Sequence, residues 1–205
     1  TAKVGDIHAP VTISITAMGE LPQSMGLTRS GARPGDDIWV SGCVGGAWAA
    51  LMHRWGKLTL DARVFPAAAL AMDRPNPRNA LGTALLSSAT ACADISDGLA
   101  QDLGHILERS GVDADVLWDA VPKHPALAAL SQEQQVEAAM SGGDDYELVF
   151  TAPADKRGLI EQASISALTP VTRIGRIVEK KPSGAPLAIR DASGRPLFLP
   201  VQGFD

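Results

Sequence analysis

Short apolar strands and amphipathic helices alternate along this chain in an irregular order, and that order limits the folds it can adopt. The clearest strand signal is YELVFT at residues 146–151, and another follows at residues 171–178. Residues 98–110 have helical spacing, with Leu99 and Leu103 on one apolar stripe. Because no strict βαβ rhythm is present, the pattern favours an α+β fold, a layered α/β sandwich with a mixed sheet, over a doubly wound parallel sheet.

The remaining elements are predicted from apolar periodicity and from the Gly and Pro residues that separate it. Further strands are expected at residues 11–17, 37–41, 91–95 and 112–118. Further helices are expected at residues 47–55, 79–88 and 132–140, from about residue 125, and at residues 154–168. A turn at residues 192–195 predicts a hairpin near the end of the chain.

Composition excludes several classes of protein. Hydrophobic residues make up 45% of the 205 residues and charged residues 20%, which excludes disordered, collagen-like and coiled-coil chains. Aromatic residues make up only 4%, so the core must consist of Ala, Leu, Val and Ile. The net charge of −5 makes nucleic acid an unexpected partner. A small anionic substrate would therefore need a local metal ion or an arginine.

Cysteine use and apolar runs bear on the compartment. Cys43 and Cys92 lie far apart, and two free thiols in a reducing cytosol are the better interpretation, with one disulfide as the alternative. The longest apolar stretch is too short and too rich in Gly to cross a bilayer, and no signal-peptide pattern is visible. These features predict a cytoplasmic protein that has no membrane partner.

Residues 94–98 (DISDG) form the first candidate site, at a predicted strand-to-helix junction. Asp94 and Ser96 would project to the same side of an extended segment, and Asp97 would lie at the start of the helix. Oxygen ligands with this spacing suit Mg²⁺, and a helix N-terminus offers N–H groups to anions. The alternative is that Ser96 or Asp97 merely caps the helix.

Residues 141–147 (SGGDDYE) form the second candidate, with three acids after two glycines and just before a strand. Such a segment can be a flexible acidic rim that approaches a cationic ring or a metal-bound phosphate. A Gly-Gly turn that carries solvated charges explains the same residues equally well.

Residues 28–36 (TRSGARPGD) form the third candidate, with an arginine beside a Gly-rich turn. Such an arginine can hold a phosphate through two hydrogen bonds, although solvated surface arginines are commoner. The four histidines lack the partner pattern of a Ser-His hydrolase, and Ser96 does not lie in a G-x-S-x-G elbow. No catalytic side chain is therefore assigned.

Three stretches that occur in this order carry a specific resemblance: T-R-S-G-A-x-P-G-D, D-I-S-D-G-L-x-x-D-L-G-H-I and S-G-G-D-D-Y-E-L-x-F. From about Val11 to Asp205, the chain resembles thiamine-monophosphate kinase. That family is part of the superfamily of aminoimidazole ribonucleotide synthetase and selenophosphate synthetase. The resemblance implies transfer of the γ-phosphoryl group of ATP to thiamine monophosphate, with several Mg²⁺ ions and ATP as co-substrate.

The family has two halves, and the resemblance places this chain in the second. Residues 1–22 are expected to be the closing strand of a missing N-terminal ATP- and Mg-binding domain, and residues 23–205 the C-terminal α/β domain. The missing half is also expected to form a homodimer. The segment alone is therefore predicted to be inactive.

Site residues carry over position by position. Arg29 and Ser96 match positions that contact ATP, and Asp94 and Asp97 match Mg²⁺ ligands. A monophosphate nucleophile is already anionic near neutral pH, so phosphoryl transfer needs positioning and charge neutralisation rather than a general base.

Two further positions match substrate contacts. Asp144 stands where many members have a glutamate that contacts thiamine monophosphate, and Val201 stands where an aromatic residue packs on that substrate. The alternatives are another ATP-dependent enzyme of the same superfamily and a non-catalytic ligand-binding domain.

Overall fold

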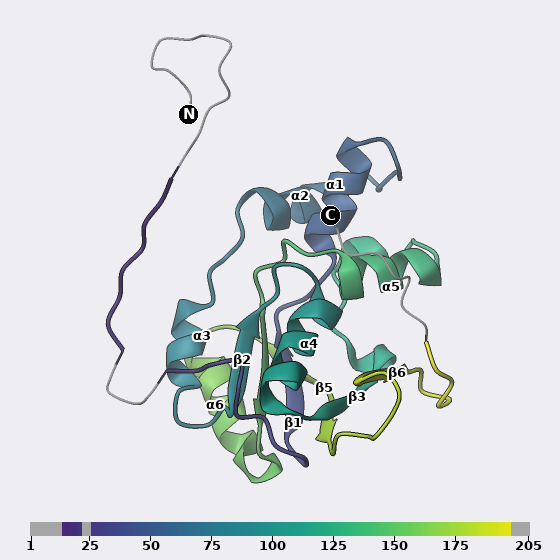
Figure 1. Cartoon of the computed structure of the whole chain (residues 1–205). Coiled ribbons are helices and arrows are strands. Elements are labelled where there is room, and N and C mark those ends of the chain that lie inside the picture. The colour runs from purple at the N-terminus through teal and green to yellow at the C-terminus, as the bar shows by residue number, and fades with distance from the viewer. Residues whose placement is uncertain (1–13, 22–25, 198–205) are drawn as a thin grey trace.

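The computed structural model describes residues 14–21 and 26–197, and its centre is a six-stranded sheet in the order β2-β4-β1-β5-β3-β6 (Figure 1). The strands are β1 Asp37–Ser41, β2 Ala91–Asp94, β3 Asp113–Leu117, β4 Leu148–Ala152, β5 Val171–Val178 and β6 Leu187–Arg190. Neighbouring strands are antiparallel except β3 and β6, which are parallel. The predicted mixed sheet is therefore confirmed.

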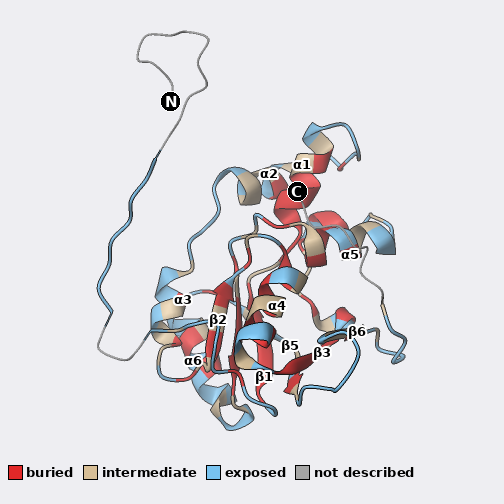
Figure 2. Cartoon of the chain, in the orientation of Figure 1, coloured by how far each residue is buried: buried red, intermediate tan, exposed pale blue. Residues whose placement is uncertain are grey.

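Helices pack on both faces of this sheet. They are α1 Gly46–Arg54, α2 Phe65–Asp73, α3 Asn79–Ala84, α4 Leu99–Ser110, α5 Gln132–Ser141 and α6 Arg157–Ser166. Short 3₁₀ turns lie at Trp118–Ala120, Pro125–Leu127 and Ala154–Lys156. Buried residues line the sheet and the inner sides of the helices, as the red parts of the ribbon in Figure 2 show. The layered α+β prediction is thus confirmed.

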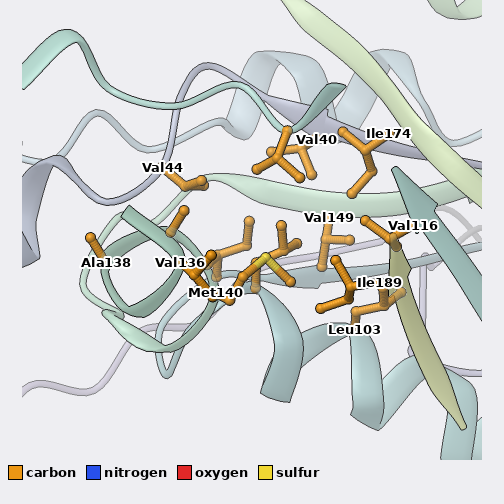
Figure 3. Packing of buried hydrophobic residues seen from close by; sticks show 14 of the residues in the cluster. Val40, Val44, Leu103, Val116, Val136, Ala138, Met140, Val149, Ile174 and Ile189 are labelled. Carbon is orange, nitrogen blue, oxygen red and sulfur yellow. The ribbon is translucent and has the colours of Figure 1, made fainter. Parts of the chain in front are cut away.

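Strand alternation produces two cores, one on each face of the sheet. Val40 and Val149 belong to the larger core, which includes residues of α4 and α5 (Figure 3). Trp39 and Phe150 point to the smaller core with residues of α3 and α6, and their rings stack with centroids 6.4 Å apart. β1 lies at the centre of the sheet, and its five residues are all buried.

Several sequence predictions agree with the structure and some do not. The strands predicted at 37–41 and 171–178 are β1 and β5, and the predicted hairpin closes through a bridge between Arg190 and Pro196. Helix α2 was not predicted, because its Ala-rich sequence shows no apolar stripe. The helix expected at 79–88 ends at Ala84, where the chain passes into turns.

Residues 14–21 are exposed and form no helix or strand, so their role as a strand of another domain stays a prediction.

Cys43 and Cys92 are free, as predicted, and burial raises the pKa of their thiols to about 11 and about 12. No helix in the described part of the chain is long and apolar enough to cross a membrane.

His124 should make the fold sensitive to acid. Its ring is buried against Gly46, its Nδ1 accepts the N–H of Ala126 at 3.1 Å, and burial lowers its pKa. The imidazole of His124 therefore binds a proton more readily in the unfolded chain than in the folded one. The buried neutral ring contributes fully to stability above the ordinary histidine pKa of about 6.5, and this stability is lost as the pH falls below that value. We expect urea unfolding from pH 7 to pH 5 to show a larger loss of stability in the wild type than in His124→Asn.

Asparagine keeps an acceptor at this position and cannot titrate. The matched control is His105→Asn, on a helix residue that is only partly buried. Equal pH dependence of the wild type and His124→Asn would contradict the assignment.

Candidate functional site

The first part of the site is the tight loop after β2. Asp94 ends the strand exposed, and the N–H of Ile95 donates to the carbonyl of Glu147 at 2.7 Å. Gly98 then has φ 120° and ψ 148°, and a Cβ there would lie 2.8 Å from the carbonyl oxygen of Met140. Only glycine fits this close approach, which turns the chain directly into α4.

Asp102, in the first turn of α4, holds the loop in place. Its buried carboxylate accepts the N–H groups of Ser96 at 2.9 Å and Asp97 at 3.0 Å, while burial raises its pKa. The N-cap of α4 is Gly98 and no side chain of the described residues caps this helix, so the capping interpretation of Ser96 and Asp97 is wrong. Ligand atoms of Asp97, Asp102 and His105 lie within 4.8 Å of one another. Both loop N–H groups bond to the same oxygen of that carboxylate, Oδ2 of Asp102.

The second acidic segment packs directly against this loop. The N–H of Asp144 donates to the carbonyl of Ser96, and that of Tyr146 to the carbonyl of Ile95, both at 2.9 Å. Asp144 and Tyr146 have positive φ values of 59° and 51°, which non-glycine residues rarely adopt. Two motifs almost fifty residues apart therefore form one structural unit.

The charges of three carboxylates act on the phenol of Tyr146. Its Oη donates to Asp144 Oδ1 at 3.2 Å, and the charge of Asp144, followed by burial and the charges of Asp94 and Asp97, raises its pKa. Among the described residues, no lysine or arginine forms a salt bridge with these three aspartates. The result is an oxygen-rich patch of uncompensated negative charge.

The other two acids of the second motif have different roles. Asp145 Oδ2 accepts the N–H of Gly45 at 2.8 Å, just before α1, and burial raises its pKa to about 7. Glu147 is buried and forms a salt bridge with Arg78. The expectation of a flexible rim of three acids is therefore corrected, because only Asp144 is exposed and the other two are held by long-range contacts.

A hollow of about 1160 Å³ opens beside this unit, and Arg29, Asp94, Tyr146 and Arg78 are among its lining residues. The third motif reaches the hollow because the carbonyl of Thr28 accepts the N–H of Cys92 in β2 at 2.9 Å. Arg29 and Asp94, predicted from separate stretches, thus share one surface.

The other predicted residues are placed differently. Ser96, Asp97 and Asp144 lie in the adjoining loops rather than among the residues lining the hollow. Val201 lies outside the described residues, so its expected substrate contact stays a prediction.

Comparison with known proteins agrees with this architecture. Residues 33–186 match the family described as AIR synthase related protein, C-terminal domain. The chain belongs to this family. The matched range, residues 33–186, contains Asp94, Ser96, Asp97 and Asp144 and excludes Arg29 and Val201.

Thiamine-monophosphate kinases are among the proteins whose sequences are similar to this chain. The thiamine-monophosphate kinase of Salmonella typhimurium is 39% identical over 175 residues, and that of Haemophilus influenzae 38% over 198 residues. These alignments cover 83% and 95% of this chain but 53% and 60% of those proteins. The AIR synthase related chain therefore spans little more than half the length of these relatives.

Solved structures give the same result. The thiamine-monophosphate kinase of Stenotrophomonas maltophilia superposes with a TM-score of 0.75 at 40% identity, covering 82% of this chain and 54% of that one. A complex described as AaThiL with AMPPCP and TMP superposes at 0.66 and 28% identity, covering 83% and 52%. Hydrogenase maturation protein HypE, at 18% identity, shares the fold of the AIR synthase related domain.

Sequence reasoning missed Asp102 and Arg78 in this AIR synthase related chain. Asp102 carried a weak signal, an acid among the apolar residues of the predicted helix. Arg78 lies in the Pro-rich stretch at residues 74–78, whose sequence indicates only a break before the next helix, and its partner Glu147 lies 69 residues further on.

Proposed function

We propose that the protein carrying this chain transfers the γ-phosphoryl group of ATP to thiamine monophosphate and produces thiamine diphosphate. The observation that carries this proposal is the joining of two acidic loops, at Asp94–Asp97 and Asp144–Tyr146, beside a hollow that Arg29 also lines. The similarity to thiamine-monophosphate kinases over most of this chain supports the choice of substrate.

The reaction needs positioned charge more than proton transfer. A phosphate oxygen of thiamine monophosphate forms the new P–O bond to the γ-phosphorus, and the bond between that phosphorus and the β,γ-bridging oxygen breaks as ADP leaves. The attacking oxygen is already anionic, so no side chain has to remove a proton. In this proposal Arg29 and Ser96 bind ATP, and Asp144 and Val201 contact the thiamine substrate.

The donor set suits Mg²⁺. Asp94, Asp97 and Asp144 offer only oxygen atoms, which this cation prefers, and all three act electrostatically on the Tyr146 phenol. We assign Asp94 and Asp97 as its ligands; bound there, Mg²⁺ would offset the charge of the ATP phosphates. Asp102 would keep the loop between these ligands in its turn through two backbone hydrogen bonds.

A direct assay tests the proposal. The full-length gene product is incubated with thiamine monophosphate, ATP and Mg²⁺, and thiamine diphosphate and ADP are quantified by chromatography. We expect the two products in equal amounts. Phosphoryl transfer to a different acceptor, with none to thiamine monophosphate, would favour another ATP-dependent enzyme of the superfamily and reject this substrate.

The 205-residue chain alone should be inactive. In the proposed arrangement, a preceding domain supplies further ligands for Mg²⁺ and ATP, residues 1–22 belong with that domain, and a homodimer forms through it in the cytoplasm. The exposed apolar side chains of Ile15, Met18 and Leu21 fit a segment that packs on other protein. We expect thiamine diphosphate from the full-length protein and none from the purified chain at equal concentration. Robust turnover by the chain would contradict this prediction.

A further inference from the structure

Arg78 stands on the wall of the hollow, although none of the three motifs contains it. It follows Pro75 and Pro77, which also line the hollow, and it directly precedes α3. The side chain of Arg78 is only 17% exposed. Asp94 and Tyr146 line the same hollow. A largely buried guanidinium at a ligand-sized cavity needs a physical explanation, because burying a charge is costly unless that charge is well paired.

Glu147 holds one edge of this guanidinium. Arg78 Nε donates to Oε2 of Glu147 at 2.7 Å and Nη2 donates to Oε1 at 2.5 Å, and these bonds raise the pKa of Arg78. This two-bond geometry fixes both the position and the plane of the guanidinium.

Glu147 is itself tightly held. Its carboxylate is 7% exposed and accepts the Ser41 hydroxyl at 2.5 Å, while Ser41 Oγ accepts the N–H of Leu148 at 2.8 Å. Gly42 has φ 54°, and a Cβ there would lie 2.0 Å from Glu147 Oε1, so only glycine leaves room for the carboxylate. The central strand β1 and the start of β4 thus fix the glutamate, and the glutamate fixes Arg78.

The pair leaves part of the guanidinium available. Arginine has five N–H groups, and the bonds to Glu147 use two of them. Within the part of the chain that the structure describes, no atom accepts from Arg78 Nη1. The remaining donors belong to a fixed, planar group at the hollow, which is the geometry that matches a phosphate.

We propose that Arg78 binds a phosphate group of the ligand in this hollow and that Glu147 is the positioning residue that orients it. This inference rests on the proposed function for the identity of the ligands, thiamine monophosphate or ATP, which share the phosphate. Arg78 and Arg29 then place two cations in the hollow to offset the negative charge that the phosphate brings next to Asp94.

Calorimetric titration of the full-length protein with thiamine monophosphate and, separately, with AMPPCP tests the proposal. Arg78→Gln should weaken binding of the ligand whose phosphate it holds by about 10- to 100-fold, as loss of a charge-assisted hydrogen bond predicts. The arm that shows the loss identifies the phosphate. The matched control is Arg74→Gln, an exposed arginine of the same Pro-rich stretch that does not line the hollow, and it should change neither affinity more than about 2-fold.

A double variant separates binding from a merely structural role. Arg78→Gln alone leaves the Glu147 charge buried without its partner, which can disturb the fold. Arg78→Gln/Glu147→Gln removes both charges and should recover thermal stability while binding stays weak. Recovery of wild-type affinity in the double variant, or unchanged affinity in Arg78→Gln, would overturn the proposal.

The positioning role and the proposed function have separate readouts. Glu147→Gln should raise KM for the ligand bound by Arg78 by about 3- to 10-fold and lower kcat less, since the guanidinium stays but loses its orientation. A fall of kcat by about 3- to 10-fold with unchanged KM would reject the positioning role. The wild type could make no thiamine diphosphate while Arg78→Gln still weakens the binding of AMPPCP. In that case the proposed function fails and the proposed contact between Arg78 and a phosphate stands.

Discussion

Asp97→Asn should lower kcat of the proposed kinase by about 100- to 1000-fold while the protein stays folded. The substitution removes a negative charge from the proposed Mg²⁺ site and leaves the shape of the side chain nearly the same. Asp97 is exposed, and its side chain accepts only one hydrogen bond within the described residues, from Gln101 Nε2 at 3.2 Å. The loss should therefore appear in catalysis and not in stability. Initial rates at saturating Mg²⁺ and a thermal melt measure the two effects.

A titration with Mg²⁺ distinguishes a metal ligand from a bystander. If Asp97 holds the ion, Asp97→Asn should need a higher Mg²⁺ concentration for half-maximal rate. The matched control is Asp155→Asn, an exposed aspartate in the 3₁₀ turn before α6, and it should leave both the rate and the Mg²⁺ dependence unchanged. Wild-type rate and Mg²⁺ dependence in Asp97→Asn would remove this residue from the proposed site.

The elements that the sequence predicted well are those with a local signal. Five of the eight residues of β5 are β-branched, and α4 shows an apolar stripe and ends just before Gly111. α2 lacks any such stripe because it consists largely of alanine and other apolar residues, of which only Ala68 is buried. The parallel pairing of β6 with β3 was not predicted, since register between distant strands depends on packing rather than on local pattern.

In the site, too, the local features were predicted and the contacts between distant segments were not. Each acidic loop was predicted from its own residues, but their union depends on the hydrogen bond from the Asp144 N–H to the Ser96 carbonyl and on the close approach of Gly143 to that same carbonyl. Neither contact has a signature in a single stretch of sequence. The roles assigned to Arg29, Asp94 and Asp97 remain predictions, although the hollow and the charge pattern suit them.

Gly98→Ala should destabilise the fold by about 3 kcal/mol and remove most of the activity as well. Its φ of 120° is costly for alanine, by about 1–3 kcal/mol, and overpacking adds a similar amount. The new methyl group would lie 2.8 Å from the Met140 carbonyl oxygen and from Ser141 Cα, both of them backbone atoms at the end of α5. Any shift of that end moves the chain that leads directly into Asp144, so stability and activity should fall together.

Gly104→Ala provides the control within the same helix. Gly104 lies in the interior of α4, and a Cβ there meets no atom within 4 Å, so alanine should stabilise the protein by about 0.5–1 kcal/mol through helix propensity. Urea unfolding of the two variants should therefore give opposite signs. A Gly98→Ala variant as stable as the wild type would mean that the backbone at this turn can relax, and the link between the Asp97 loop and the Asp144 loop would then not depend on glycine.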